Sequence, residues 1–188
     1  MILLASQSPR RRELLAQIGC SFEVLVSDAE EVMTDALAPE DVVRENARRK
    51  ALAVAKLRPD VPVLGADTVV ARAGHIYGKP KDAADARHML ASLAGGAHEV
   101  LTGIALVHGG TVWDDVARTR VFFAPMTQEE IVRYVATGEP MDKAGAYAVQ
   151  GRAAAFIERI EGSYSNVVGL PLHAVCTLAQ RARVNLGI

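Results

Sequence analysis

The chain has 188 residues, 50% hydrophobic and 23% charged, and its 21 basic and 22 acidic residues give a formal net charge of −1. This length and apolar content predict a globular α/β protein with a sizeable core and exclude a disordered chain. The balanced charge argues against nucleic acid or an anionic membrane as partner. No apolar run approaches the roughly 18 residues that a membrane span needs.

The N-terminal residues do not have the order of a secretory signal, because the apolar run comes first and the basic residues Arg10–Arg12 follow it. The two cysteines, Cys20 and Cys176, form no CxxC pair and are expected to be thiols in a reducing compartment. We therefore expect a cytoplasmic protein.

Strand-like and helix-like segments alternate along the first half of the chain. A strand is expected at residues 2–5, and a helix should begin at Pro9 with Ser8 as its N-cap and end at Gly19. The pattern then predicts a strand at residues 22–26, a long helix from Pro39 to about residue 56, and an apolar strand at residues 62–70.

The second half continues with a helix after Lys81 whose inward residues include Ala84, followed by a long hairpin. The hairpin strands are expected at residues 99–107 and 111–123, a helix with a capping box follows at Thr127, a strand at residues 156–160, and a last helix near Gly169. These elements predict one domain, residues 1–188, with an α/β mixed sheet. The polar, glycine-bearing segment 138–151 is the best candidate for a functional loop.

Three charged features stand where local rules disfavour them, which in natural sequences happens mainly at functional sites. Arg10–Arg12 lie in the first turn of a helix, where positive charge opposes the helix dipole. They are either a solvated basic turn or an anion cradle in which Arg10 and Arg11 converge on phosphate.

The other two features are Lys50 and Asp67. Lys50 lies on the apolar stripe of the long helix, so its ammonium either reaches the edge of the core or projects into a cleft. Asp67 lies inside an apolar strand, where a carboxylate must be paired, bind metal or reach solvent. It could cap a nearby backbone, ligate a metal or act as a general base.

Several common chemistries are absent from the sequence. It contains no Walker phosphate loop, dinucleotide fingerprint, HExxH or GxSxG motif, and its five histidines lack zinc-ligand spacing. Its aromatic residues do not interleave with basic ones as a nucleic-acid stacking platform would.

Six segments, in order along the chain, resemble the motifs of the Maf family of nucleotide pyrophosphatases, and the similarity runs from Leu3 to about Leu172. They are residues 5–11 (ASQSPRR), 64–68 (LGADT), 78–80 (GKP), 98–103 (HEVLTG), 138–147 (GEPMDKAGAY) and 162–171 (GSYSNVVGLP). The resemblance implies the fold of inosine triphosphate pyrophosphatases, an elongated mixed sheet with flanking helices. It also implies cleavage of a nucleoside triphosphate to monophosphate and pyrophosphate with Mg²⁺ or Mn²⁺, in a house-cleaning role.

The resemblance assigns roles to individual residues. Asp67 becomes the proton acceptor that activates water, and Glu31, Lys50 and Lys79 match further active-site positions. Asp67 and Glu31 are the candidate metal ligands, and whether Asp67 is base, ligand or both stays open.

Further matches concern substrate binding and specificity. Ser8 and Arg11 match the phosphate-binding motif, and Arg11, Thr68 and Gln150 match the residues of the branch that acts on dTTP and UTP. The side-chain amide of Gln150 offers a donor and an acceptor to the imide edge of uracil or thymine, whereas cytosine presents an amino group there.

Three alternatives remain. The same chemistry could act on modified purine nucleotides. The protein could be a regulatory binder in cell division, since the family is associated with septum formation. Binding of nucleic acid through the two arginine clusters is disfavoured by the charge balance. From relatives we also expect a homodimer.

Overall fold

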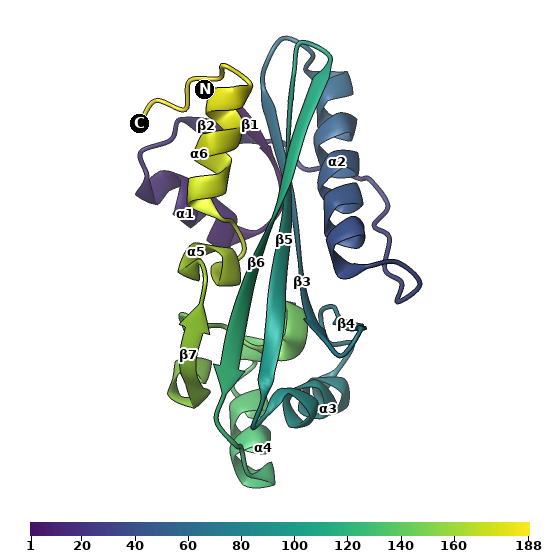
Figure 1. The fold of residues 1–188 in the computed structure, drawn as a ribbon, viewed down its shortest axis with the longest axis vertical. Coiled ribbons are helices and arrows are strands. Elements are labelled where there is room, and N and C mark those ends of the chain that lie inside the picture. The colour runs from purple at the N-terminus through teal and green to yellow at the C-terminus, as the bar shows by residue number, and fades with distance from the viewer.

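The computed structural model describes all 188 residues, and it confirms the predicted α/β mixed sheet (Figure 1). In chain order its elements are β1 (Ile2–Ala5), α1 (Pro9–Gln17), β2 (Phe22–Val24), α2 (Pro39–Leu57), β3 (Val63–Arg72), β4 (His75–Tyr77), α3 (Ala83–Leu93), β5 (Ala97–His108), β6 (Thr111–Phe123), α4 (Gln128–Ala136), β7 (Ile157–Glu161), α5 (Tyr164–Val168) and α6 (Leu172–Arg181). Three 3₁₀ helices, η1 (Glu139–Asp142), η2 (Ala144–Ala146) and η3 (Arg152–Phe156), occupy the segment between α4 and β7. None of the helices is both long and apolar enough to cross a membrane.

The seven strands form one sheet in the order β2-β1-β3-β5-β6-β7, with β4 paired to β3. β1 pairs in parallel with β2 and β3, and the pairs from β3 through β5 and β6 to β7 are antiparallel. The hairpin β5–β6 runs almost the full length of the molecule (Figure 1). Gly109 and Gly110 form its turn, both at positive φ, which glycine adopts without strain.

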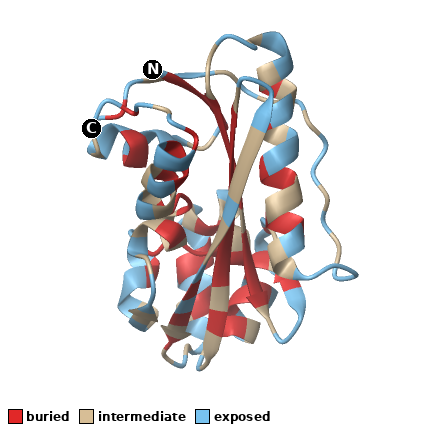
Figure 2. Cartoon of the chain, turned by 45° about the horizontal axis from the view of Figure 1, so that its top comes forward, coloured by how far each residue is buried: buried red, intermediate tan, exposed pale blue.

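Helices cover both faces of the sheet and divide the core into clusters. α2 covers one face, while α1 and α6 cover the upper part of the other face and α3 and α4 its lower end (Figure 1). The buried residues are concentrated where the sheet meets these helices, and the tip of the β5–β6 hairpin is largely exposed (Figure 2). Two clusters of core residues therefore lie on the face covered by α1, α6, α3 and α4, and α2 spans the opposite face.

α2 approaches the sheet closely because two glycines lie beneath it. A Cβ atom on Gly65 of β3 would collide with the backbone of Ala47, and one on Gly103 of β5 would collide with the backbone of Val43. The absence of side chains at these two positions lets the helix backbone rest on the strands. This contact fixes the height of α2 above β3.

The structure corrects several local predictions. Ser8 occupies the N-cap position of α1, but its side chain makes no capping hydrogen bond. The second strand ends at Val24 rather than residue 26, and Ala84 is exposed while Ala86 is the buried residue of α3. The pattern also missed β4, α5 and the 3₁₀ helices, because elements of three to five residues are too short to show a period. The capping box of Thr127 with Glu130 is confirmed.

We predict that Gly65→Ala lowers the free energy of unfolding by about 1–3 kcal/mol, because the added methyl group forces α2 away from β3. Urea unfolding measures the change. Ala84→Val, which adds carbon atoms at an exposed site on α3, is the control and should cost much less. Equal stability of Gly65→Ala and the wild type would contradict the close contact.

Candidate active site

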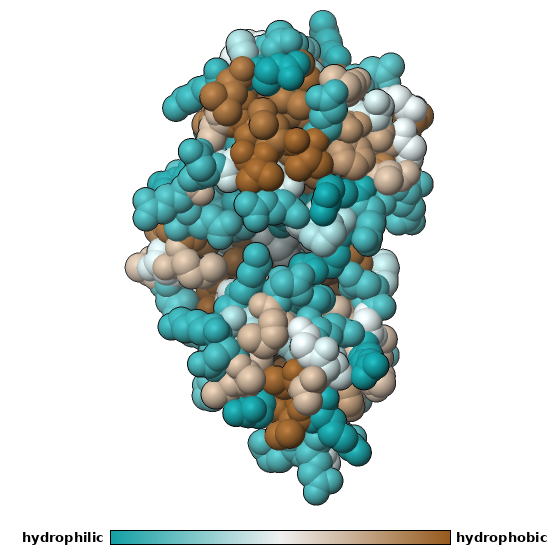
Figure 3. All heavy atoms as spheres, turned by 180° about the vertical axis from the view of Figure 1, so that it is seen from behind, coloured by the Kyte–Doolittle hydropathy of each residue, from teal (hydrophilic) through white to brown (hydrophobic).

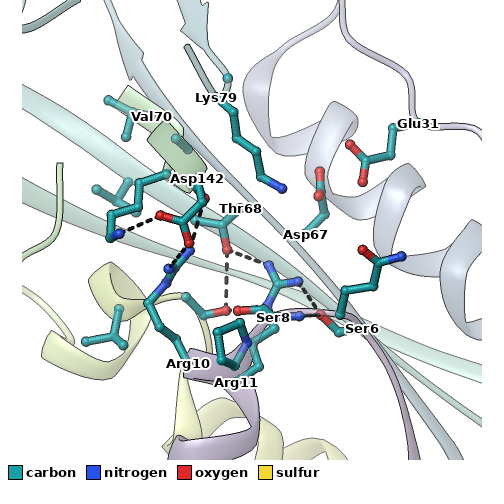
Figure 4. A pocket seen from close by; sticks show the side chains of 18 of the residues that line it. Ser6, Ser8, Arg10, Arg11, Glu31, Asp67, Thr68, Val70, Lys79 and Asp142 are labelled. Atoms are coloured by element: carbon teal, nitrogen blue, oxygen red, sulfur yellow. Dashed lines mark hydrogen bonds and ion pairs between the residues drawn. The ribbon is translucent and has the colours of Figure 1, made fainter. Parts of the chain in front are cut away.

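A cleft of about 550 Å³ opens beside the middle of β3 (Figure 4). β1 pairs with residues 63–65 of β3, and β4 pairs with residues 70–72 on the same edge, so residues 66–69 face no strand there. The lining comes from residues 5–11, the segment 25–38, α2, β3, β5, residues 78–79, the segment 142–150 and residues 167–169. The predicted functional loop 138–151 thus contributes one wall of the cleft.

Strand alternation sends Asp67 and Thr68 to opposite faces of the sheet. Asp67 lies on the face covered by α2, as do Gly65 and Val69. Thr68 lies on the other face, where its hydroxyl is 2.9 Å from the hydroxyl of Thr102. Because the strand edge is open at this point, the cleft reaches both side chains.

Asp67 is buried and both its carboxylate oxygens are bound by α2. The ammonium of Lys50 donates to Oδ1 at 2.7 Å, and the side-chain amide of Asn46 donates to Oδ2 at 2.9 Å. Lys50 therefore projects into the cleft, which decides between the two placements that the helix pattern allowed. Asp67 is paired, as its position in an apolar strand required.

Glu31 and Lys79 complete this end of the cleft. The ammonium of Lys50 also contacts Glu31 Oε1 at 2.7 Å. Partial burial alone would raise the pKa of Glu31, but the hydrogen bond from Lys50 and the charges of Lys50, Lys79 and Arg11 outweigh it and lower that pKa. Lys79 is exposed, makes no ion pair and points toward Asp67 (Figure 4).

Arg11 is buried beneath the cleft and is bonded to protein on nearly every side. Its Nε donates to the carbonyl of Gly169 at 2.8 Å and its Nη1 to the carbonyl of Ala66 at 2.9 Å and the hydroxyl of Ser6 at 3.0 Å. Its Nη2 donates to the hydroxyl of Thr68 at 3.0 Å. Burial lowers the pKa of Arg11, and the negative charge of Asp67 partly offsets this shift.

Arg10 pairs across the cleft with the opposite wall. Its Nη1 donates to Asp142 Oδ2 at 2.8 Å, and Lys143 donates to Asp142 Oδ1 at 2.5 Å (Figure 4). Burial alone would raise the pKa of Asp142, but hydrogen bonds from Lys143 and Arg10 hold this pKa at about 2. Arg10 and Arg11 are thus both bonded to protein oxygens in this structure, and their predicted convergence on phosphate stays a prediction.

The remaining predicted residues, Ser8 and Gln150, also line the cleft, and Gln150 is exposed. All eight predicted site residues thus lie on one cleft: Ser8, Arg11, Glu31, Lys50, Asp67, Thr68, Lys79 and Gln150. Sequence reasoning missed Asn46, Asp142 and Lys143 as partners of this site. The signal for Asn46 was available, since it is a polar residue one helical turn before Lys50 on the buried side of α2.

The cleft is cationic although the whole chain is almost neutral. Five cationic side chains line it (Arg10, Arg11, Lys50, Lys79, Lys143) against three carboxylates (Glu31, Asp67, Asp142). Seen from behind, the surface at mid-height is hollowed and hydrophilic, and the largest apolar area lies above it (Figure 3). The arrangement suits a small polyanion.

The carboxylates fit a metal ion only in part. No group of three or more His, Cys, Asp or Glu side chains in the structure could hold a metal. Asp67 and Glu31 both contact the ammonium of Lys50, so they can supply two oxygen ligands close to one another. Mg²⁺ in phosphoryl-transfer enzymes is commonly bound by one or two carboxylates together with phosphate oxygens and waters. The pair therefore fits a metal shared with a phosphate substrate.

Comparison with known proteins decides the family. The chain matches the family model described as Maf-like protein over residues 1–182. It is 49% identical over 187 residues to a dTTP/UTP pyrophosphatase of Pelotomaculum thermopropionicum, covering 98% of each chain. It is 56% identical over 172 residues to a dTTP/UTP pyrophosphatase of Gloeobacter violaceus, covering 91% of this chain and 90% of that one. This chain belongs to the Maf family.

The fold of this Maf protein is shared more widely. The structure of the Staphylococcus aureus Ham1 protein superposes with a TM-score of 0.54 at 14% identity and covers 96% of this chain and 98% of that one. This likeness concerns the fold alone, and it confirms the predicted mixed sheet of the inosine triphosphate pyrophosphatase type.

We predict that Arg11→Lys destabilises this Maf protein by about 1–3 kcal/mol, because one ammonium cannot replace hydrogen bonds to four separate acceptors. Urea unfolding measures the change, with Arg12→Lys at the exposed neighbouring position as control. A stability loss no larger than that of the control would show that the buried network contributes little.

We predict that the Arg10–Asp142–Lys143 cluster makes the fold acid-sensitive. The folded pKa of Asp142, about 2, lies below the ordinary value of about 3.9, so its ionised form stabilises the fold above pH 4. This contribution is lost as the pH falls toward 2. The difference in Tm between the wild type and Asp142→Asn should therefore shrink from pH 5 to pH 2. Glu158→Gln, at an exposed glutamate outside any ion pair, should show no such trend.

Proposed function

We propose that this Maf protein hydrolyses dTTP and UTP, and modified pyrimidine nucleotides of the same shape, to the monophosphate and pyrophosphate. The observation that carries the proposal is the cationic cleft with a buried carboxylate, Asp67, held at its centre by Lys50 and Asn46. Curated relatives that are about half identical over nearly the whole chain carry the name dTTP/UTP pyrophosphatase.

The charges of the cleft match those of the substrate. A nucleoside triphosphate carries about four negative charges, and enzymes that cleave it act mainly by positioning and charge stabilisation. Lys50 is bonded to Asp67, and Lys79, which has no ion-pair partner, points toward Asp67, so both would bind the phosphate oxygens around the reacting phosphorus (Figure 4). Arg10 and Lys143 lie on the other side of the cleft from Asp67. They would bind the phosphates in place of their present partner, Asp142.

Asp67 would accept the proton of the attacking water. The water oxygen bonds to the α phosphorus, the bond to the bridging oxygen breaks, and pyrophosphate leaves with that oxygen. Each oxygen of Asp67 accepts one hydrogen bond from α2 and retains a lone pair for a water proton. The carboxylate stays oriented because two different side chains hold it.

Asp67 and Glu31 would also hold the divalent cation, Mg²⁺ or Mn²⁺, that we propose as cofactor. When bound, such an ion neutralises phosphate charge and lowers the pKa of a coordinated water. With substrate bound, the ammonium of Lys50 would leave the two carboxylates and bind a phosphate oxygen. Its long, flexible side chain permits this movement.

Base recognition would come from the other face of β3. Thr68 is held by Arg11 and Thr102, and Gln150 lies exposed on the lining of the cleft. An amide at Gln150 can pair with the imide edge of uracil or thymine in complementary fashion. Ser8, at the start of α1, is positioned to contribute to phosphate binding.

We further propose that residues 1–188 act as one catalytic domain and as a homodimer in the cytoplasm, where nucleoside triphosphates are available. A regulatory binder in cell division is the competing function. That function would not require Asp67 to lie between Lys50 and Asn46 in a cleft of net positive charge.

We predict metal-dependent release of pyrophosphate from dTTP and UTP by the wild type. Asp67→Asn should lower this rate about 100-fold or more, because it removes the proton acceptor at nearly constant volume. The assay is a panel of common and modified nucleoside triphosphates with and without Mg²⁺ or Mn²⁺. Faster turnover of modified purine nucleotides would show that the enzyme prefers purines. No turnover of any nucleotide would favour the regulatory binding protein.

We predict that Gln150→Glu weakens turnover of dTTP and UTP more than residual turnover of other triphosphates, because a carboxylate cannot donate to the carbonyl oxygens of the base. The ratio of kcat/KM for UTP to that for CTP measures the effect and should fall at least about tenfold. Equal losses for all bases would remove Gln150 from base recognition.

A further inference from the structure

Asn46 is a fully buried amide at the centre of the site, one turn before Lys50 on α2. A buried side-chain amide without partners would destabilise the fold, so its contacts define its role. All of those contacts are made to two places, the carboxylate of Asp67 and the backbone of Val32.

The orientation of the Asn46 amide is fixed by these partners. Its Oδ1 accepts from the backbone N–H of Val32 at 2.7 Å, so its Nδ2 must face the other acceptors. Nδ2 donates to the carbonyl of Val32 at 2.8 Å and to Asp67 Oδ2 at 2.9 Å, which uses both of its hydrogens. The flipped amide would place an oxygen against a carboxylate and a carbonyl and is excluded.

We propose that Asn46 is a positioning residue for hydrolysis: one amide holds the carboxylate of Asp67 and ties it to the backbone of Val32, next to Glu31. The inference rests on the proposed function and names a residue that sets the geometry of Asp67 without touching substrate. Since Asp67 lies on β3 and Glu31 on the segment 25–38, their relative position depends on side-chain links such as this one.

The neighbouring contacts show why Lys50 alone does not fix the position of Asp67 relative to Glu31. Lys50 joins the same two carboxylates, but through a flexible side chain whose ammonium is also needed by phosphate. The segment 25–38 that carries Glu31 contains no helix or strand. When Lys50 moves to an anion, Asn46 remains as the rigid connection between Asp67 and this segment.

The first test is steady-state kinetics of Asn46→Ala with UTP, together with calorimetric binding of a UTP analogue whose α–β bridging oxygen is a methylene group. Loss of a hydrogen bond to a charged group should lower kcat about 10- to 100-fold. KM and the Kd of the analogue should change less than about threefold, because the phosphate-binding cations stay in place.

Asn166→Ala is the matched control. Asn166 is equally buried and also donates both Nδ2 hydrogens, to the carbonyl of Val100 and the hydroxyl of Thr119, but it does not contact Asp67. Its substitution should lower Tm without the selective loss of kcat. An Asn46→Ala enzyme with unchanged kcat, or with the same kcat and KM changes as Asn166→Ala, would overturn the proposal.

A second test does not depend on activity. Asn46→Asp places two carboxylates face to face and should lower Tm by about 5–10 °C. The exchange Asn46→Asp with Asp67→Asn restores this hydrogen bond in reverse and should regain part of that loss, since the new carboxylate still faces the carbonyl of Val32. The exchanged protein should stay inactive, because its carboxylate is on α2. No recovery of Tm would overturn the contact between positions 46 and 67.

A wild type inactive toward all nucleotides would instead refute the proposed function. The Tm values of these variants would still show whether Asn46 holds Asp67.

Discussion

The open edge of β3 between its pairing with β1 and its pairing with β4 is the constraint on which the site depends. A continuous strand partner would bury residues 66–69 and leave no cleft. Since neighbouring residues of a strand face opposite ways, the gap exposes Asp67 on one face and Thr68 on the other to the same cavity. The proposed chemistry at Asp67 and the proposed base recognition at Thr68 are therefore assigned to two adjacent residues on opposite faces of one strand.

The gap is stable because side chains replace the missing strand. Arg11 donates to the carbonyl of Ala66 at the open edge and to the hydroxyl of Thr68, and its other bonds anchor it to Ser6 and Gly169. On the α2 side, the close approach over Gly65 brings Lys50 and Asn46 within hydrogen-bond distance of Asp67. The architecture thus exchanges backbone pairing for side-chain pairing over one short stretch.

Much of this could be predicted from the sequence, for identifiable reasons. Long elements such as α2 and the β5–β6 hairpin have strong periods, and the conflicts at Lys50 and Asp67 marked the site because each charge breaks an apolar pattern. The partners of each side chain could not be predicted. The pattern of α2 allowed Lys50 two placements, and the close approach of the α2 backbone to Gly65 decides between them. Asn46 could be noticed as a polar residue one turn before Lys50, but its partners Asp67 and Val32 could not be read from the sequence.

The arginines of α1 also show the difference between a pattern that the sequence reveals and the side-chain partners that only the structure reveals. The sequence shows that three arginines, Arg10–Arg12, lie in the first turn of α1, but only the structure shows where each guanidinium group lies. Arg11 points into the core and becomes part of the scaffold beneath Thr68, whereas Arg10 points across the cleft to Asp142. Each cation near Asp67 except Lys79 is already bound to protein oxygen in this structure, so Lys50 must exchange a carboxylate for a phosphate oxygen when the proposed substrate binds. Arg11, which is bonded to four protein acceptors, is the cation that is oriented in advance, and preorganised charge of this kind is the main way in which enzymes stabilise developing charge.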